Sequence, residues 1–119
     1  NLNATIALAS INKYENNLEI RKKNLDFLKQ SVIIDYSFLE HDNESSYYFA
    51  SLLCDNADIK MNKMNIGRSY PLLHKTTYFC DKFHVLTNAE RIHSKICNVP
   101  IHQNLKEKDI SFILEVLNE

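Results

Sequence analysis

Residues 4–30 contain neither glycine nor proline, and this uninterrupted stretch constrains the fold more than any other feature of the sequence. Its apolar residues recur at intervals of three, four and seven, which is the spacing of one stripe along an α-helix. The stripe consists of Leu8, Ile11, Tyr14, Leu18, Leu25 and Leu28. Arg21 interrupts it, and the pair Asn16-Asn17 lowers the helix propensity near its middle. The pattern therefore predicts a single helix of 27 residues.

A helix of that length is long for the chain that carries it. At 1.5 Å per residue it would extend about 40 Å, whereas a compact domain of this size has a radius of gyration of roughly 13–14 Å and a diameter near ~35 Å. Either the helix breaks, or one of its ends lies against something outside this chain. The sequence begins without a methionine in the middle of the apolar stripe. We therefore expect the chain to be part of a longer protein.

The single glycine excludes several classes of nucleotide-binding protein. A chain of 119 residues with average composition would hold roughly eight glycines, and Gly67 stands alone here. The dinucleotide-binding fingerprint and the P-loop each need several glycines within a few residues. Neither motif can be formed within these residues.

Charge and hydropathy exclude further partners. The net charge is -1, from 14 basic and 15 acidic side chains, which does not favour nucleic acid or an anionic membrane surface. No apolar run approaches the ~18 residues of a membrane span, and no signal peptide opens the sequence. The three cysteines, Cys54, Cys80 and Cys97, are odd in number and scattered. This pattern is typical of free thiols in a reducing compartment, so we expect a cytoplasmic protein with no membrane or nucleic-acid partner.

The remainder of the chain alternates between strand and helix patterns. Strands are predicted at residues 31–36, 47–54, 66–70 and 97–101, and helices at 55–64, 88–96 and 106–117, with an irregular stretch at 72–87. Asn88 is expected to cap its helix, and Gly67 is expected at or near the end of the helix before it. The order predicts a mixed α/β (α+β) layer in which helices pack on a small sheet. We divide the chain into a long inter-domain helix, residues 1–30, and a small α/β domain, residues 31–119.

Two residues of the predicted strand 66–70 are candidates for binding a ligand. Alternation along a strand places Arg68 and Tyr70 on one face, and Pro71 ends the strand. A guanidinium beside a phenol can bind a diphosphate or sugar hydroxyls. The alternative is a surface arginine next to a half-buried tyrosine. His74, in the following loop, either contacts substrate or holds loop backbone in place.

Two further groups of residues are weaker candidates. Cys80, His84, His93 and Cys97 form the pattern C-x3-H-x8-H-x3-C. Zinc takes such ligands, but the spacing matches no common zinc finger and buried free cysteines are frequent, so no metal site is predicted. The basic run Arg21-Lys22-Lys23 with Lys29 is interpreted as a solvated helix face rather than as a phosphate-binding patch.

Several segments resemble one known family, in the order in which that family has them. They are Asn1-Leu-Asn-Ala-Thr-Ile-Ala-Leu-Ala-Ser-Ile11, the stretch Lys13 to Asn24, Ile66-Gly-Arg-Ser-Tyr-Pro71 with Leu73-His74, Asn88-Ala-Glu-Arg91 with Val99-Pro-Ile-His102, and Leu105-Lys-Glu-Lys-Asp-Ile110. Together they resemble the DegT/DnrJ/EryC1/StrS aminotransferases, which are fold-type I, pyridoxal-phosphate-dependent sugar aminotransferases. The sequence departs from the family pattern at Ala7, where glycine is usual, at Ser69, where many members have histidine, and at Gln103, where proline is usual. The departure at Ser69 removes one possible substrate contact.

The resemblance implies the C-terminal small domain of an aspartate-aminotransferase-like fold, together with the helix that leads into it. It places the Schiff-base lysine, the aspartate that pairs with the pyridinium and the phosphate-binding loop upstream of Asn1. No catalytic or cofactor-binding residue is therefore expected in this chain, and Arg68, Tyr70 and His74 remain its candidate substrate-binding residues.

The resemblance also implies an activity. The family uses pyridoxal 5'-phosphate as an electron sink to move an amino group from glutamate or glutamine to a keto-sugar nucleotide, with a role in polysaccharide biosynthesis. The active site lies at a homodimer interface, so this chain alone is expected to be inactive. Two alternatives stay open: a non-catalytic α+β interaction module, and a degenerate family member that serves as a subunit.

Overall fold

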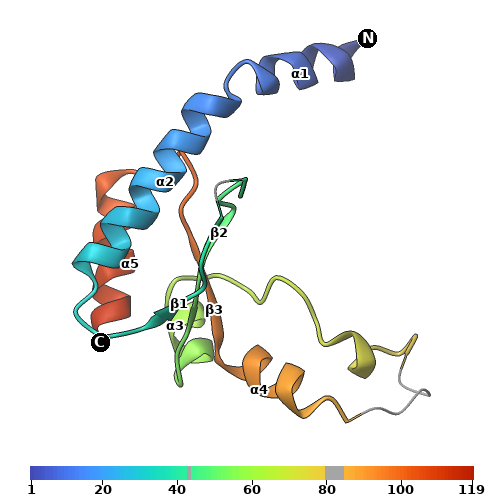
Figure 1. Ribbon diagram of the computed structural model, residues 1–119, viewed down its shortest axis with the longest axis vertical. Coiled ribbons are helices and arrows are strands. Elements are labelled where there is room, and N and C mark those ends of the chain that lie inside the picture. Colours follow the sequence, from blue (N-terminus) through green and yellow to red (C-terminus); the bar gives the residue numbers. More distant parts are fainter. Residues whose placement is uncertain (43, 80–84) are drawn as a thin grey trace.

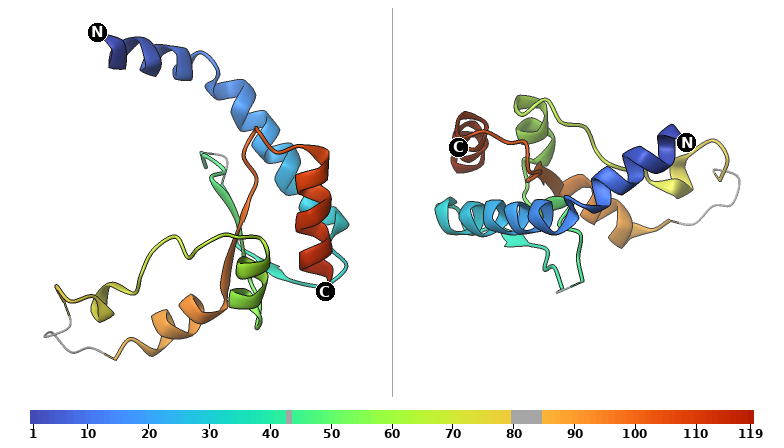
Figure 2. Two further views of the ribbon diagram at one scale, coloured as in Figure 1. Left: turned by 180° about the vertical axis from the view of Figure 1, so that it is seen from behind. Right: turned by 90° about the horizontal axis from the view of Figure 1, so that it is seen from above.

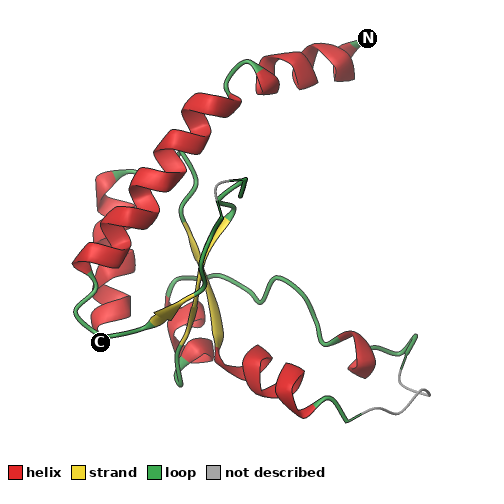
Figure 3. Cartoon of the chain, viewed as in Figure 1, coloured by secondary structure: helices red, strands yellow, loops and turns green. Residues whose placement is uncertain are grey.

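The computed structural model describes residues 1–42, 44–79 and 85–119 and has the predicted mixed α+β architecture (Figure 1; Figure 3). In chain order the elements are α1 (Leu2–Ile11), α2 (Tyr14–Ser31), β1 (Ser37–Phe38), β2 (Phe49–Leu53), α3 (Ala57–Lys63), the 3-10 turn η1 (Leu73–Lys75), α4 (Thr87–Lys95), β3 (Ile96–Pro100) and α5 (Glu107–Asn118). The sequence therefore located α3, α4, α5, β2 and β3 to within a few residues.

The sheet has three antiparallel strands in the order β1-β2-β3. On its buried face, Ala50 lies opposite Val99 and Leu52 lies opposite Cys97. These four side chains have no exposed surface, so the centre of the sheet is also the centre of the core. Alternate positions on the same strands are half-buried on the other face, which is the period-2 pattern of a sheet covered on one side.

Helices α2, α3 and α5 contribute the remaining core. Leu25 and Leu28 of α2, Met61 of α3, and Ile113 and Leu117 of α5 join one cluster with the buried strand residues. Figure 2 shows α2 and α5 side by side in both views. The helical spacing of the predicted stripe thus accounts for the burial of Leu25 and Leu28, whereas Tyr14 of the same stripe is 51% exposed.

The single helix predicted for residues 4–30 is wrong: it is two helices. Helix α1 ends at Ile11 and α2 begins at Tyr14. The amide of Asn12 donates to the carbonyl of Leu8 at 3.0 Å, and the amide of Lys13 donates to the carbonyl of Ser10 at 3.2 Å, a tightened turn that redirects the chain. Helix α1 has no buried residue and extends away from the rest of the molecule (Figure 1).

Two extended parts, α1 and the arm that contains η1 and α4, account for the large dimensions of the molecule. Its radius of gyration is 16.9 Å and its extents are 45 × 44 × 27 Å, which exceeds the roughly 13–14 Å expected for a compact domain of this length. In Figure 1, α1 extends from one end, and the η1 segment with α4 forms an arm at the other. The apolar stripe continues through both helices, but it is covered only along α2.

The strand predicted at residues 31–36 is also wrong. Helix α2 continues to Ser31, and β1 is confined to Ser37–Phe38. The intervening segment is held by the end of α5, because the amide of Ile33 donates to Asn118 Oδ1 at 2.8 Å and the hydroxyl of Tyr36 donates to the carbonyl of Leu117 at 2.6 Å. Contacts with a helix distant in sequence thus replace the expected strand pairing.

Two local predictions about helix ends also fail. Helix α4 begins at Thr87, so Asn88 lies inside it and does not cap it. After α3 the left-handed conformation is adopted by Asn65, with φ 54°, and not by Gly67. Asparagine adopts this conformation more readily than other residues with side chains.

Candidate functional site

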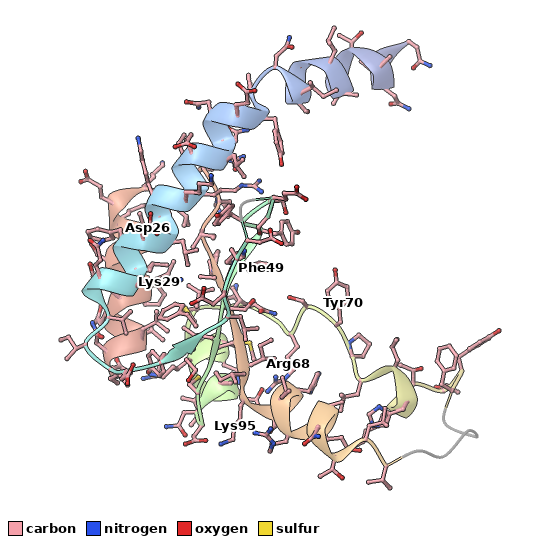
Figure 4. The ribbon with its side chains drawn as sticks, viewed as in Figure 1. Asp26, Lys29, Phe49, Arg68, Tyr70 and Lys95 are labelled. Atoms are coloured by element: carbon pink, nitrogen blue, oxygen red, sulfur yellow. The ribbon has the colours of Figure 1, made fainter. Side chains whose placement is uncertain are left out.

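Residues 66–70, predicted as a strand, form an irregular segment that does not join the described sheet. The backbone of this segment is tied to α3, where the amide of Ile66 donates to the carbonyl of Met61 at 2.9 Å. The alternation that would place Arg68 and Tyr70 on one face therefore does not apply. Figure 4 shows Arg68 directed toward the junction of α4 and β3, whereas Tyr70 points away from α4.

The Arg68 guanidinium is bound by the C-terminal end of α4. It donates to the carbonyl of His93, to that of Ser94 at 3.2 Å and to that of Ile96 at 3.3 Å. Its Nη2 atom also lies 2.6 Å from Oδ1 of Asp58 on α3. A cation here satisfies carbonyls left unpaired at the helix end and complements the negative end of the helix dipole. Arg68 thus connects α3, α4 and the segment to which it belongs.

Tyr70 is held through its backbone. Its carbonyl accepts a hydrogen bond from Nε2 of His93 at 3.1 Å, so Nε2 carries the proton in this arrangement. The Tyr70 residue is 79% exposed, and its ring extends into the space beside the sheet (Figure 4). This combination of a fixed backbone and an exposed aromatic side chain suits contact with a ligand.

The side chain of His74 is held against α4 by a hydrogen bond to the carboxylate of Glu90. Its Nε2 lies 3.0 Å from Oε1 of Glu90, and the ammonium of Lys75 lies 2.9 Å from Oε2 of the same side chain. The His74 side chain is only 13% exposed. The hydrogen bond from His74, and then that from Lys75, lower the pKa of Glu90 below its ordinary value. The carboxylate is therefore charged at neutral pH, with an oxygen for each donor.

Two hollows flank this segment. One, of about 340 Å³, lies between residues 68–72 and α4, and Asn98 of β3 also lines it. The second, of about 510 Å³, is mainly apolar and is lined by residues 71–74 with Phe79, Leu86 and Ala89. Pro71 and Leu72 line both hollows. The three sequence-predicted residues are therefore gathered along one side of α4, although they do not share one cavity.

A short polar line connects the sheet to the first hollow. The hydroxyl of Ser51 donates to Oδ1 of Asn98 at 2.7 Å, and Nδ2 of Asn98 donates to the hydroxyl oxygen of Ser69 at 2.8 Å. No local pattern in the sequence points to Ser51 or Asn98. The pair is directly opposite in the β2–β3 register, and that register cannot be derived from local spacing. Glu90 belongs to the motif Asn88-Ala-Glu-Arg91 and His93 to the pattern C-x3-H-x8-H-x3-C, but neither was predicted to contact residues 70–75.

The basic face of α2 makes more contacts than a solvated face would. Arg21 donates to Oε1 of Gln103 at 3.1 Å and to the carbonyl of Ser46 at 3.2 Å. The ammonium of Lys22 lies 5.3 Å from the ring centroid of Tyr47. A further hollow of about 470 Å³ borders Arg21 and runs toward α1. These contacts assign Arg21 a structural role in joining α2 to two loops.

Two of the three cysteines lie within the described ranges, and both are buried free thiols. Burial, followed by the neighbouring thiol of Cys54, raises the pKa of Cys97 to about 12, and burial also raises the pKa of Cys54. Among the described residues there is no cluster of three or more side chains suited to a metal ion. The pattern C-x3-H-x8-H-x3-C cannot be assessed as a whole, since Cys80 and His84 lie outside those residues.

Across the described ranges, no helix combines the length and the apolar composition needed to cross a membrane.

The sequence model of the DegT/DnrJ/EryC1/StrS aminotransferase family matches residues 1–118. A comparison with curated protein sequences found no match.

Solved structures with the same fold include three bacterial proteins. The aminotransferase TlmJ from Streptoalloteichus hindustanus superposes with a TM-score of 0.82 at 19% identity, over 97% of this chain and 34% of its own. The sugar aminotransferase CalS13 from Micromonospora echinospora gives 0.72 at 15% identity, over 93% and 32%. The PMP form of Spr1654 from Streptococcus pneumoniae gives 0.78 at 17% identity, over 93% and 32%. The chain thus spans about a third of the length of each of these structures.

Proposed function

The chain belongs to the DegT/DnrJ/EryC1/StrS aminotransferase family, and on that premise we propose that it is the C-terminal part of a pyridoxal-phosphate-dependent sugar aminotransferase. The reaction we propose moves an amino group from glutamate or glutamine to a keto-sugar nucleotide. The observation that carries the proposal is the family match over residues 1–118. Similarity to the fold of a sugar aminotransferase, CalS13, supports the same class of substrate.

Within this chain, Tyr70 and His74 are the proposed substrate contacts that the geometry favours. Tyr70 is an exposed ring on a fixed backbone, and phenol rings stack on sugars and bases while the hydroxyl donates a hydrogen bond. His74 has one ring nitrogen held by Glu90, which leaves Nδ1 as the atom for a substrate. Both residues border the hollows beside α4.

Arg68 is the third proposed contact, and a ligand can reach it only by replacing one of its present partners. Its Nη2 atom is shared by the exposed carboxylate of Asp58 and the carbonyl of Ser94. A diphosphate would therefore have to displace the Asp58 carboxylate, which exchanges one anion for another at the same nitrogen. The contacts with the other carbonyls at the end of α4 would remain.

We propose that none of the described residues of this chain holds the cofactor. Pyridoxal phosphate needs a lysine amine directed into its pocket, and the buried lysine of the described ranges, Lys60, donates to the carbonyls of Val116 and Leu117. We propose that the cofactor is held by the part of the protein that corresponds to the remaining two thirds of the relatives' length. The chain alone is then inactive.

We propose that the complete enzyme is a cytoplasmic homodimer. Helix α1 supports an interface because its apolar residues Leu2, Ile6, Leu8 and Ile11 are more than half exposed. Surfaces of this kind are covered in the working form of a protein. The free thiols of Cys54 and Cys97 agree with a reducing compartment.

An absorbance spectrum of the full-length protein tests the proposed function. We expect the visible band of protein-bound pyridoxal phosphate, and we expect L-glutamate to shift it. A full-length protein that binds no pyridoxal phosphate, or whose band is unchanged by both L-glutamate and L-glutamine, would contradict the proposal and favour a degenerate subunit. An initiator methionine immediately before Asn1 would favour the independent interaction module.

A further inference from the structure

We propose that Glu90 and His93 of α4 are positioning residues that set the conformation of residues 70–75. This inference rests on the proposed function, because residues 70–75 hold two of the proposed substrate contacts. Glu90 lines neither hollow, whereas His93 also lines the hollow of about 340 Å³. Each acts through the segment that it holds.

Glu90 holds the C-terminal half of the segment. Its two carboxylate oxygens each take a different donor, His74 Nε2 at 3.0 Å and Lys75 Nζ at 2.9 Å. Both partners belong to the 3-10 turn η1. Because one oxygen is directed at the imidazole, the ring is oriented with Nε2 toward α4 and Nδ1 away from it.

His93 holds the N-terminal half. Its Nε2 donates to the carbonyl of Tyr70 at 3.1 Å, and its own carbonyl accepts from Arg68. Side chains three residues apart lie on the same face of a helix. Glu90 and His93 therefore present two contacts from one face of α4 to two ends of one short segment.

Among the described residues, few other contacts define the conformation of the segment. Its regular structure is the three-residue turn η1, and it is not paired with any described strand. The local backbone bonds run from Lys75 to Leu72 at 2.9 Å and from Thr76 to Leu73 at 3.1 Å. Tyr70 and Leu73 are exposed by 79% and 66%. Without a sheet ladder or a buried core, the bonds from α4 decide where Tyr70 and His74 lie.

The test uses the full-length protein and two measurements that separate the inference from the proposed function. The variants are Glu90→Ala, Glu90→Gln and His93→Ala, with Glu115→Gln on the exposed side of α5 as the matched control. Amide hydrogen exchange is followed by mass spectrometry in a peptide covering residues 70–79 and, as an internal reference, in peptides covering β2 and β3. Dissociation constants are measured for UDP and dTDP, and the reaction with L-glutamate is followed by absorbance.

We expect Glu90→Ala and His93→Ala to accelerate exchange in residues 70–79 about tenfold, which corresponds to the loss of one hydrogen bond to a charged or strongly polar group, with β2 and β3 unchanged. Glu90→Gln keeps one acceptor oxygen and should give a smaller effect. The dissociation constant of the nucleoside diphosphate that the wild type binds should rise several-fold, whereas the reaction with L-glutamate should stay within about twofold. Glu115→Gln should change none of these quantities.

Each other result decides one of the two claims. Unchanged exchange in residues 70–79 for both alanine variants overturns the positioning role. Accelerated exchange with unchanged affinity keeps that role but overturns the substrate-binding role of the segment. A wild type that binds neither UDP nor dTDP overturns the nucleotide part of the proposed function, and the exchange measurement still decides the positioning role. If Glu90→Ala does not fold, Glu90→Gln provides the comparison.

Discussion

Arg68 Nη2 lies 2.6 Å from Oδ1 of Asp58, although the arginine side chain is 21% exposed and the aspartate side chain is 71% exposed. A mostly buried guanidinium thus has one nitrogen turned toward a solvated anion. The rest of the group is committed to carbonyls at the end of α4. This division makes the structural and the ligand-binding roles of Arg68 separable by experiment.

We predict that Arg68→Ala in the full-length enzyme raises KM for the nucleotide sugar by about tenfold to a hundredfold, the range for a hydrogen bond to a charged group of 1.5–3 kcal/mol. The half-reaction with the amino donor should change much less, because that donor carries no diphosphate. Single-turnover kinetics of the two half-reactions measure this difference. Asp58→Asn is the informative partner variant: it leaves the carbonyl contacts of Arg68 in place and should leave KM unchanged or lower it. Equal damage to both half-reactions by Arg68→Ala would assign the residue a structural role only.

Lys60 is predicted to stabilise the end of α5. Its buried ammonium donates to the carbonyls of Val116 at 2.9 Å and Leu117 at 3.3 Å, and it lies 5.7 Å from the ring centroid of Tyr36. Lys60→Met keeps a side chain of similar length but removes the ammonium from both carbonyls, of which that of Leu117 keeps its hydrogen bond from Tyr36. We expect the free energy of unfolding to fall by about 1.5–3 kcal/mol, as for other hydrogen bonds to charged groups. Urea unfolding measures it.

The control for Lys60 is Lys63→Met, on the same helix. Lys63 pairs with Glu119 at the surface, and both side chains are 48% exposed. Exposed ion pairs contribute little to stability, so this variant should unfold close to the wild type. A Lys60→Met protein as stable as Lys63→Met would contradict the capping role of Lys60.

The thiols of Cys54 and Cys97 are predicted to be unreactive in the folded protein. Burial raises the pKa of both, that of Cys97 to about 12, and the thiolate is the reactive form. In a Cys80→Ser background, an alkylating reagent at pH 8 should label neither residue until urea is added. Mass spectrometry of the labelled protein measures this. Rapid labelling of native protein, or a disulfide between the two residues, would contradict the prediction.

Helix α1 is predicted to make the isolated 119-residue chain associate. Leu2, Ile6, Leu8 and Ile11 are exposed by 74%, 56%, 59% and 68%, and exposed apolar surfaces of this kind promote association. We expect the isolated chain to bind a hydrophobic dye and to elute larger than a monomer in size-exclusion chromatography. Replacing Ile6 and Leu8 with serine should reduce both dye binding and association. An unmodified chain that is monomeric and binds no dye would contradict the prediction.

Stability should fall in acid through identified carboxyl groups. Hydrogen bonds from Lys95, His74 and Lys63 lower the pKa values of Asp55, Glu90 and Glu119 below their ordinary 3.8, 4.5 and 4.5. A lowered carboxyl pKa stabilises the folded state above the ordinary value, and the contribution is lost as pH falls through the lower folded-state pKa. Urea midpoints measured from pH 6 to about pH 3 should therefore decline.

The matched variant for the acid prediction is the triple substitution Asp55→Asn, Glu90→Gln and Glu119→Gln. It should be less stable than the wild type near neutral pH, and its midpoint should decline less between about pH 5 and pH 3. Surface exposure limits the size of the effect. Parallel declines in the two proteins would show that these three groups do not contribute.

Elements that bury a regular apolar stripe could be predicted from spacing alone. Leu25 and Leu28 on α2, and Ile113 and Leu117 on α5, lie where the helical period places them, and β2 alternates as a half-covered strand should. The strand predicted at residues 66–70 is wrong because no regular apolar spacing determines the structure of this segment. That segment is held by the hydrogen bonds of Arg68 to carbonyls at the end of α4, and a pattern of five residues contains no information about those partners.

In the candidate site, too, some residues could be predicted from the sequence and their partners could not. The motifs that resemble the aminotransferase family include Tyr70 and His74, which stay predicted substrate contacts, and the family match supports the resemblance itself. They did not identify Glu90 as the partner of His74 or His93 as the partner of Tyr70. The members of the two pairs are 16 and 23 residues apart in the sequence.

The sequence by itself determined the order of most elements, the residues that face the core and the family, because these depend on local spacing and on residue identity at short range. Only the tertiary structure decided that the long helix breaks after Ile11, that Arg68 turns inward and that α4 holds residues 70–75. The physical reason for the last two is that they depend on hydrogen bonds between groups that are distant in sequence, whereas the helix break is a local change in backbone hydrogen bonding. The free energy of such contacts depends on a geometry that exists only once the chain has folded.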